Sequence, residues 1–591
     1  MPKSIARSLE KTLNNERTPC VREEREWNPF DDMNAGLSLS TRIHCTAMVA
    51  LLHRYSFESL PPLLGHTTCF DAALEGADAT ATVRLSYPLR FNEGNAMTTK
   101  IYKNLIGGKW VGAESGKTFL NHNPANVDDV VGEFQASGEA DVDRAVQAAR
   151  AAYRQWRLLP APKRGEILYR TGELLLRHKE DLARQMTREM GKVLSETRGD
   201  VQEAADTAFY MAGEGRRLFG QTTPSELPDK FAMSVRMPVG VCGMIAPWNF
   251  PMAIPSWKLF PALVCGNTCV IKPAEDTPLS TINLVELLLE AGLPDGVVNI
   301  VTGFGPDAGA PLVAHPDVDA ISFTGSSEVG RIVAQTAAGL FKPCSLEMGG
   351  KNAMIVLEDA NLDLALDGAV WGAFGTTGQR CTATSRIIVQ KSVAGEFTRR
   401  LVERAKALRV GDGLDDKVEM GPQINQQQVE TSARYTAIAQ KEGAKLLTGG
   451  SRLDALSRGF FFAPTVFGGV GPEMRIAREE VFGPVVSVLE CDSFDQAITF
   501  ANGIEYGLST ALYSRNVNLA FKAMRDLEAG ITYINAPTIG AEVHLPFGGV
   551  KHTGNGHREG GTGALDFYTS WKAVYVDYSD RLQRAQIDTG E

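Results

Sequence analysis

A cysteine in a glycine-bearing loop is the strongest candidate nucleophile in the chain. Cys381 lies in the stretch GTTGQRCTATSR, residues 375–386, at the start of a new structural element and directly after Arg380. A lone cysteine is most often a small buried hydrophobe. Here the loop could also expose the sulfur, and the adjoining cation would favour its ionised form. The motif therefore also fits a reactive thiolate that attacks an electrophilic carbon.

Two other motifs carry groups that such an attack would need. In PWNFP, residues 247–251, Asn249 follows an apolar strand in a proline-stiffened turn, where its amide could donate to a developing alkoxide. In LEMGG, residues 346–350, burial between apolar neighbours would raise the pKa of Glu347 toward that of a general base. Each motif also has a plainer interpretation: a simple turn for the first, and a glutamate that reaches solvent for the second.

The residues after two other strands indicate a dinucleotide cofactor. VIKPAE, residues 270–275, ends a strand with Lys272 and then Glu275. That carboxylate could bind ribose hydroxyls and would repel a 2′-phosphate, which favours NAD over NADP. FTGS, residues 323–326, turns a strand into a helix whose free N–H groups could hold pyrophosphate. The nearby GFG, residues 303–305, is not a dinucleotide fingerprint and indicates little by itself.

Strand and helix signals alternate around these motifs from residue 238 onward. Apolar strands are predicted at residues 239–246, 267–271, 297–301 and 320–323, and an amphipathic helix is predicted at residues 278–291. A second run of the same pattern begins near residue 346, with strands at 352–356 and 386–390 and a helix at 362–374. A strongly helical stretch is expected earlier, at residues 141–191. The pattern predicts an α/β protein with two tandem Rossmann-like parallel-sheet domains.

Composition excludes several classes of protein. The chain has 591 residues, 43% of them hydrophobic, and a formal net charge of -10, which is ordinary for a globular protein and unsuited to nucleic acid or an anionic membrane. Prolines and a lysine interrupt its most apolar stretch, residues 241–271, so no membrane span is expected. Nine cysteines without zinc-ligand spacing predict no metal site and a reducing, cytoplasmic location.

The first 96 residues differ from the rest of the chain in composition and periodicity. They mix Pro, Ser, Arg and acidic residues without sustained periodicity, which predicts little independent fold. They also lack a signal-peptide core, and their acidic residues argue against a transit peptide. A translation start at Met97 would suit the sequence better, so residues 1–96 are expected to be either a regulatory arm or an artefact of the assigned start.

Taken in order, the motifs closely resemble those of the aldehyde dehydrogenase superfamily. The series is APWNFP, KPAE, FTGS, LEMGG, GQRC, EEVFGP (residues 479–484) and PFGGVKHTG (residues 546–554), and the similarity runs from about residue 97 to the C-terminus. The resemblance implies Cys381 as nucleophile, Asn249 with the Cys381 N–H as oxyanion donors, Glu347 as base and Lys258 in a proton relay. It implies cofactor contacts at Ile245, Trp248, Lys272, Glu275, Gly305, Gly325, Ser326, Glu480 and Phe482.

The resemblance also implies a mechanism and an assembly. A thiohemiacetal would pass a hydride to NAD, and water activated by Glu347 would release a free carboxylic acid without a metal. An NAD-binding domain is expected at residues 97–348, interrupted by a small β oligomerisation arm near 225–237. A catalytic domain at 349–550 and a C-terminal oligomerisation segment at 551–591 complete the chain. The tail would pack on a neighbouring subunit, with an edge strand at 574–578, in a homodimer or homotetramer.

The substrate is argued from Arg380. Its permanent charge beside the cysteine could clamp an anionic tail, such as that of 2-oxoglutarate semialdehyde or succinate semialdehyde, or could pair with a structural acid. GQRCTATSR is similar to 2-oxoglutarate-semialdehyde dehydrogenases, and other motifs resemble antiquitin-type enzymes, although GHRE at residues 556–559 departs from the usual Gly-Arg-Glu run. The alternatives are a broad-specificity aldehyde dehydrogenase and a thiol hydrolase, which would have no use for a dinucleotide cleft.

Overall fold

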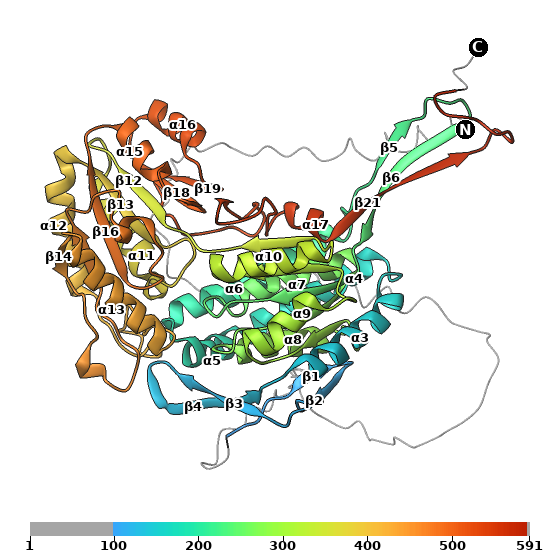
Figure 1. Cartoon of the computed structure of the whole chain (residues 1–591), viewed down its shortest axis with the longest axis horizontal. Coiled ribbons are helices and arrows are strands. Elements are labelled where there is room, and N and C mark those ends of the chain that lie inside the picture. The colour runs from blue at the N-terminus through green and yellow to red at the C-terminus, as the bar shows by residue number, and fades with distance from the viewer. Residues whose placement is uncertain (1–98, 588–591) are drawn as a thin grey trace, which may run out of the picture. The chain divides into compact units, whose positions relative to one another are not determined.

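The computed structural model describes residues 99–587, all of them within one compact unit, Gly94–Glu591. The expectation for residues 1–96 lies outside the described residues. Within residues 99–587, none of the helices combines the length and the apolar character that crossing a bilayer requires. The expected fold class is confirmed, because two parallel-sheet domains follow one another and a separate small sheet forms an arm (Figure 1).

The first domain is built on a seven-stranded sheet in the order β11-β10-β7-β8-β9-β1-β2. Its parallel strands are β7 (Val241–Ile245), β8 (Thr268–Lys272), β9 (Val298–Ile300), β10 (Ala320–Thr324) and β11 (Cys344–Glu347), and β1 (Asn104–Ile106) and β2 (Lys109–Val111) continue it antiparallel. The parallel strands are buried on both sides, which explains their nearly continuous apolar sequences.

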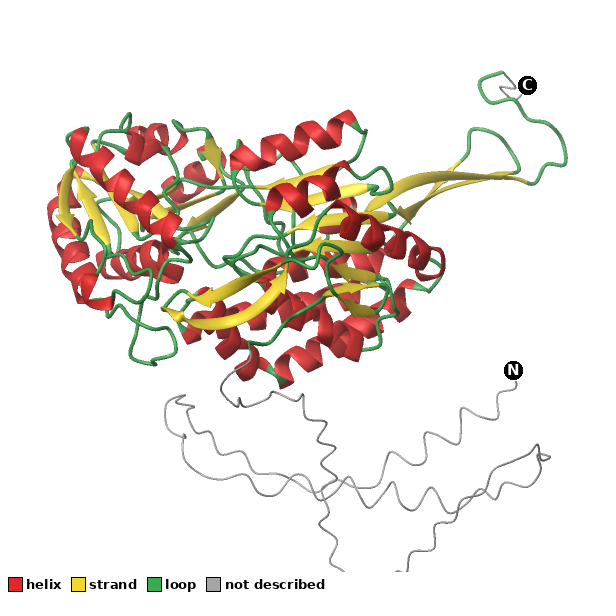
Figure 2. Ribbon diagram, turned by 60° about the horizontal axis from the view of Figure 1, so that its bottom comes forward, coloured by secondary structure: helices red, strands yellow, loops and turns green. Residues whose placement is uncertain are grey.

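Helices cover both faces of this sheet (Figure 2). One face carries α3 (Glu139–Trp156), α9 (Ala310–Ala314) and α10 (Ser327–Gly339). The other carries α7 (Ala253–Cys265) and α8 (Pro278–Glu290), over which pack α4 (Ala161–Arg177), α5 (Lys179–Met190) and α6 (Leu194–Glu214). The hairpin of β3 (Thr118–Asn123) and β4 (Asn126–Gln135) stands apart from the sheet's hydrogen bonding.

The strand order reverses between β7 and β10. From β7 the chain moves outward to β8 and β9, and it then returns to β10 on the other side of β7. The loops that follow β7 and β10 therefore diverge at their carboxyl ends and leave a crevice, the usual ligand position in an open parallel sheet. The motifs containing Asn249 and Ser326 occupy these two loops.

The second domain repeats this architecture with the strand order β14-β15-β16-β13-β12-β18-β19. Its parallel strands are β12 (Asn352–Val356), β13 (Thr384–Gln390), β15 (Thr465–Gly468), β16 (Val485–Cys491), β18 (Ser509–Tyr513) and β19 (Ile531–Ile534), with β14 (Lys445–Thr448) antiparallel at one edge. Helices α11 (Leu362–Phe374) and α12 (Lys391–Ala407) share one core. The opposite core contains α13 (Gln426–Lys441), α14 (Arg475–Arg478), α15 (Phe494–Asn502) and α16 (Val517–Asp526).

The arm is a three-stranded antiparallel sheet that projects from the first domain in both views (Figures 1 and 2). It consists of β5 (Gln221–Pro224), β6 (Lys230–Pro238) and β21 (Thr569–Asp577). The predicted edge strand at 574–578 is longer than expected. It pairs along its whole length with β6 of the same chain, from Thr569 with Pro238 to Asp577 with Lys230. Among the described residues, the other edge of β21 has no strand partner.

The segment before β21 is hydrogen-bonded to both domains. Strand β20 (Val550–Lys551) pairs with β17 (Tyr506–Gly507) of the second domain, and Gly554 forms a β-bridge with Glu347. The chain thus crosses back to the first domain through the short helix α17 (Gly563–Phe567) before it reaches the arm. Residues 551–568 therefore belong to the body around the candidate site, because their backbone is hydrogen-bonded there.

Candidate active site

Cys381 is held in a tight loop between α11 and β13. The loop begins with a 3-10 turn, Gly375–Gly378, in which Thr376 and Thr377 adopt left-handed backbone angles (φ 50° and 58°). The side-chain amide of Asn352 donates to the carbonyls of Cys381 (2.7 Å) and Ala383 (2.9 Å). These bonds fix the backbone at Cys381, so the position of this residue does not depend on a flexible loop.

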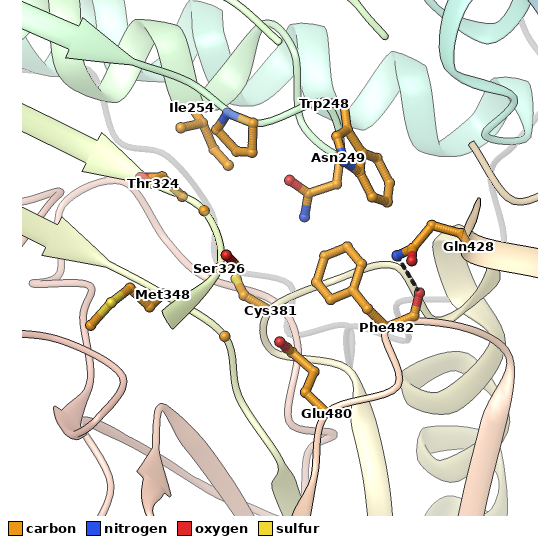
Figure 3. Close-up of a pocket in the computed structure, with 13 residues that line it drawn as sticks. Trp248, Asn249, Ile254, Thr324, Ser326, Met348, Cys381, Gln428, Glu480 and Phe482 are labelled. Atoms are coloured by element: carbon orange, nitrogen blue, oxygen red, sulfur yellow. Dashed lines mark hydrogen bonds between the residues drawn. The ribbon is translucent and has the colours of Figure 1, made fainter. Parts of the chain in front are cut away.

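Two adjoining cavities share Cys381. The Trp248 cavity, about 660 Å³, is lined by Trp248, Asn249, Gly325, Ser326, Glu480 and Phe482 among others (Figure 3). The Glu347 cavity, about 720 Å³, is lined by Glu203, Phe250, Trp257, Glu347, Arg380, Phe547 and Glu559 among others. A group bonded to Cys381 can therefore be reached from two sides.

Asn249 lies beside the cysteine in the Trp248 cavity. Its side chain is buried, and its Nδ2 donates to the carbonyl of Gln379 (3.1 Å). Figure 3 shows the amide nitrogen turned into the cavity. A primary amide has two N–H donors, so one remains for an oxygen bound at Cys381. The arrangement suits an oxyanion donor.

Glu347 ends β11 in the Glu347 cavity. Its side chain is buried, and neither carboxylate oxygen has a hydrogen-bond partner among the described residues. Burial first, and the nearby Glu559 second, raise the pKa of this carboxyl well above its ordinary value, although Lys258 and Arg558 oppose the shift. An unpartnered buried carboxyl of this kind is suited to exchange a proton with water or a thiol.

The expectation that its surroundings favour a Cys381 thiolate is wrong. Burial raises the pKa of the Cys381 thiol to about 12, and the charges of Glu480 and Glu347 add to the rise. The backbone N–H groups of Cys381 and Thr382 oppose it. Desolvation is the largest cause, so the protonated thiol is the favoured form at neutral pH.

Arg380 has a structural acid as partner, one of the two alternatives for this residue. Its Nη2 pairs with Glu196 (3.0 Å), and its Nε donates to Thr376 Oγ1 (2.9 Å). The guanidinium lies 5.3 Å from the centre of the Phe250 ring. Arg380 nevertheless lines the Glu347 cavity, and no hydrogen bond involves its Nη1 among residues 99–587. Nε and Nη2 of the guanidinium are thus engaged, and Nη1 can still donate a hydrogen bond.

Lys258 is fully buried and does not line either cavity. Its Nζ forms an ion pair with Glu559 and donates to Ser322 Oγ (3.0 Å). Glu559 in turn lines the Glu347 cavity. Lys258 can therefore act on the cavity through Glu559 as well as through its charge on Glu347. From the sequence, Glu559 stood out only as part of a departure from the family motif. The acidic residue in GHRE, just after the 546–554 motif, was the available signal.

Another wall of the Trp248 cavity is made of aromatic rings and backbone. The rings of Trp248 and Phe482 meet edge to face with centroids 5.3 Å apart. Glu480 accepts from the Gly350 N–H (2.8 Å), and burial raises its pKa to about 7. A Cβ on Gly349 would displace the Glu480 carboxylate from this position, so the glycine permits the close approach.

Gly325 and Ser326 form the junction between β10 and α10. The Ser326 hydroxyl accepts from the Val329 N–H (3.3 Å) and caps the helix. Its position leaves the N-terminus of α10 at the wall of the Trp248 cavity, where both residues lie. Backbone N–H groups at such a helix start are suited to an anion.

The other four predicted cofactor residues lie outside both cavities. Ile245 and Lys272 are paired in register at the carboxyl ends of β7 and β8, and Lys272 forms an ion pair with Glu275 (2.9 Å). Gly305 begins a π-helix, Gly305–Gly309, and a Cβ on Gly309 would lie 3.7 Å from both Ile245 and Lys272. These residues form a second cluster at the same sheet edge as the Trp248 cavity. Within residues 99–587, no group of His, Cys, Asp and Glu side chains could hold a metal ion.

Comparison with known proteins identifies the family. A model described as "Aldehyde dehydrogenase family" matches residues 110–574. The chain is 43% identical to the alpha-ketoglutaric semialdehyde dehydrogenase of Bacillus subtilis, over 80% of this chain and 98% of that protein. It is 42% identical to retinaldehyde dehydrogenase 3 of Mus musculus, over 82% of this chain and 94% of that protein.

A solved structure agrees with these matches. The betaine aldehyde dehydrogenase of Staphylococcus aureus, crystallised in complex with NAD+, superimposes with a TM-score of 0.80 at 36% identity, covering 81% of this chain and 96% of that one. The protein therefore belongs to the aldehyde dehydrogenase family, a family of oxidoreductases, as its motifs predicted.

Proposed function

We propose that this protein oxidises a semialdehyde with a carboxylate tail to the corresponding dicarboxylate, with NAD as electron acceptor. The observation that carries the proposal is the place of Cys381 between two cavities. Asn249 lies in one and Glu347 in the other. A thiol hydrolase would need only the Glu347 cavity.

The residues around the Trp248 cavity fit NAD. The ring pair of Trp248 and Phe482 offers apolar surface, and the glycine at 349 lets Glu480 approach closely. Gly325 and Ser326 would hold the pyrophosphate at the start of α10, and Lys272 with Glu275 would hold the adenosine ribose. When bound, NAD supplies a hydride acceptor for the carbon attached to Cys381.

The first step is attack of the Cys381 sulfur on the aldehyde carbon. Because the thiol has a raised pKa, its proton must pass to a base as the C–S bond forms, and Glu347 lines the same cavity. The carbonyl electron pair moves to oxygen. The Asn249 amide and the Cys381 N–H would donate to that alkoxide.

Loss of the hydride leaves a thioester on Cys381, which water then cleaves. Glu347 would take a proton from the water as its oxygen attacks the acyl carbon, and the C–S bond breaks to return the thiolate and a carboxylic acid. The ion pair of Lys258 and Glu559 adjoins this carboxyl and provides an onward route for the proton. The balance is aldehyde, water and NAD+ to carboxylate, NADH and two protons.

The substrate class follows from the lining of the second cavity. The B. subtilis relative is named for alpha-ketoglutaric semialdehyde, whereas the mouse relative of nearly equal identity is named for retinaldehyde. Overall identity thus does not choose between them. The available Nη1 of Arg380 in the Glu347 cavity favours an anionic tail.

The experiment is an aldehyde panel followed by NADH absorbance, with NAD and NADP and with Cys381→Ala as control. We expect 2-oxoglutarate semialdehyde to exceed pentanal, an uncharged aldehyde of the same length, by about tenfold or more in kcat/KM. Arg380→Leu should remove most of that preference. Equal kcat/KM for both aldehydes would support a broad-specificity enzyme instead, and NADH production by Cys381→Ala would contradict the mechanism.

We infer that the protein is a homodimer or homotetramer and is cytoplasmic. The arm supports the assembly, because one edge of β21 has unpaired backbone groups among the described residues and edge strands of this kind pair with other chains. Free cysteines in the described part support a reducing compartment. Light scattering coupled to size exclusion would measure the assembly, and a monomeric mass would contradict it.

A further inference from the structure

Three acidic residues of α6 lie on the face of the helix directed at the candidate site. Glu196, Asp200 and Glu203 are spaced four and three residues apart, which places them on one side of the helix. Two of them have partners: Glu196 pairs with Arg380 (3.0 Å), and Asp200 pairs with the buried Lys192 (2.6 Å). The third differs.

The Glu203 carboxyl has no hydrogen-bond or ion-pair partner among the described residues, yet it lines the Glu347 cavity together with Arg380. Arg380, the cation that lines this cavity, is already paired with Glu196. An ionised Glu203 would therefore leave the wall with a surplus negative charge, which opposes an anionic tail.

The surroundings decide the protonation state. Burial first, and Asp200 second, raise the pKa of Glu203 to about 8, while Lys192 and Arg380 oppose the rise. The other ionisable groups that interact with it or share its cavity are Asp206 on α6, Tyr533 on β19, Cys381, Glu347 and Glu559. At neutral pH Glu203 is thus mainly a neutral acid with an O–H to donate.

We propose that Glu203 is a specificity-determining residue, whose protonated carboxyl donates a hydrogen bond to the carboxylate tail of the substrate in the cavity wall that it shares with Arg380. The inference rests on the proposed function and adds a condition to it. The preference for a charged tail exists while Glu203 holds its proton and disappears when Glu203 ionises. An uncharged aldehyde makes no such contact and is indifferent to this proton.

The test is the ratio of kcat/KM for 2-oxoglutarate semialdehyde over pentanal, measured from about pH 6.5 to about pH 9.5. Titration of Glu347 and Cys381 affects both aldehydes and cancels in the ratio. For the unmodified enzyme we expect the ratio to fall by about ten- to a hundredfold as pH rises through about 8, because a hydrogen bond to a charged group is lost and replaced by repulsion.

Two variants locate the effect. Glu203→Gln keeps an N–H donor without the charge, so its ratio should stay high and flat across the range. Asp206→Asn removes an exposed acid three residues along the same helix that contributes least to the raised pKa of Glu203, so its ratio should still fall, at a slightly lower pH than in the unmodified enzyme. Pentanal turnover and thermal unfolding check that each variant is folded.

The outcomes separate the two proposals. A flat ratio in the unmodified enzyme, with the semialdehyde preferred at every pH, overturns the role of Glu203 and leaves the substrate class standing. A Glu203→Gln ratio that falls with pH like the unmodified one also overturns it. Oxidation of pentanal without preference for the semialdehyde even at about pH 6.5 refutes the substrate class itself.

Discussion

The two cavities on either side of Cys381 are built from different materials. The Trp248 cavity is made of aromatic rings, glycines and a helix start, and Glu480 is its one carboxyl. The Glu347 cavity has three carboxyls, Glu203, Glu347 and Glu559, together with Arg380. A site that binds the same cofactor in every turnover can be made of rigid backbone. A site that moves protons and chooses a substrate needs groups that titrate, so the pH dependence of proton transfer and of substrate choice should arise in the second cavity.

The comparison is tested most strongly at Asn249, which lines the Trp248 cavity and is proposed to donate to the alkoxide. Asn249→Ala removes a preorganised donor to the alkoxide and should lower kcat by about 10²- to 10³-fold. KM for NAD should change little. Steady-state kinetics with NAD varied at saturating aldehyde measures both. A large rise in KM for NAD with unchanged kcat would assign Asn249 to cofactor binding instead.

Glu559 tests the link between charge and base strength in the Glu347 cavity. Its negative charge raises the pKa of Glu347, and Glu347 acts as base only when ionised, so the rate should rise with pH as that proton is lost. Glu559→Gln keeps an acceptor for Lys258 but removes the charge. The rising limb of the kcat profile should move to lower pH, with about a tenfold change in rate where the two profiles differ most.

If the rising limb of the kcat profile is not shifted in Glu559→Gln, the charge of Glu559 does not affect the pKa of Glu347. Glu347→Gln is the matched control, since it should abolish the rising limb altogether.

Glu275 offers the smallest expected effect and probes the cofactor side alone. In place of a carboxylate, Glu275→Gln presents a neutral amide near the predicted ribose contact, so repulsion of a 2′-phosphate should weaken. We expect kcat/KM for NADP to rise by several fold to about tenfold while aldehyde selectivity stays constant. A change in aldehyde selectivity without any gain for NADP would argue against the division of labour between the cavities.

Much of the framework could be predicted from sequence because buried parallel strands leave a clear apolar signal. The strand at 352–356 and the helix at 362–374 have the predicted bounds. The helical stretch at 141–191 proved to be three helices, separated near Pro160 and His178. Helix α6 was missed, because its many small and acidic residues give only a weak amphipathic pattern.

The same contrast holds for the site. Asn249 and Glu347 could be chosen as candidates because each is marked by its own short motif, Asn249 after an apolar strand and Glu347 between apolar residues and a glycine pair. Glu203 and Glu559 could not, since their roles depend on contacts with distant segments. The prediction of a Cys381 thiolate was wrong for a related reason. The sequence shows the adjacent arginine, but it shows neither the pairing of that arginine with Glu196 nor the cost of desolvating the thiolate.

The most direct test of the account is to trap the acyl group. Glu347→Gln, mixed with NAD and 2-oxoglutarate semialdehyde, should release NADH in a single slow burst of about one equivalent per site and then stop, because water is no longer activated. Mass spectrometry should find the acyl group as a thioester on the peptide that contains Cys381. Continued steady turnover, or an acyl group on a different cysteine, would contradict the central claim, which is that Cys381 lies between the two cavities and forms the covalent bond to the substrate.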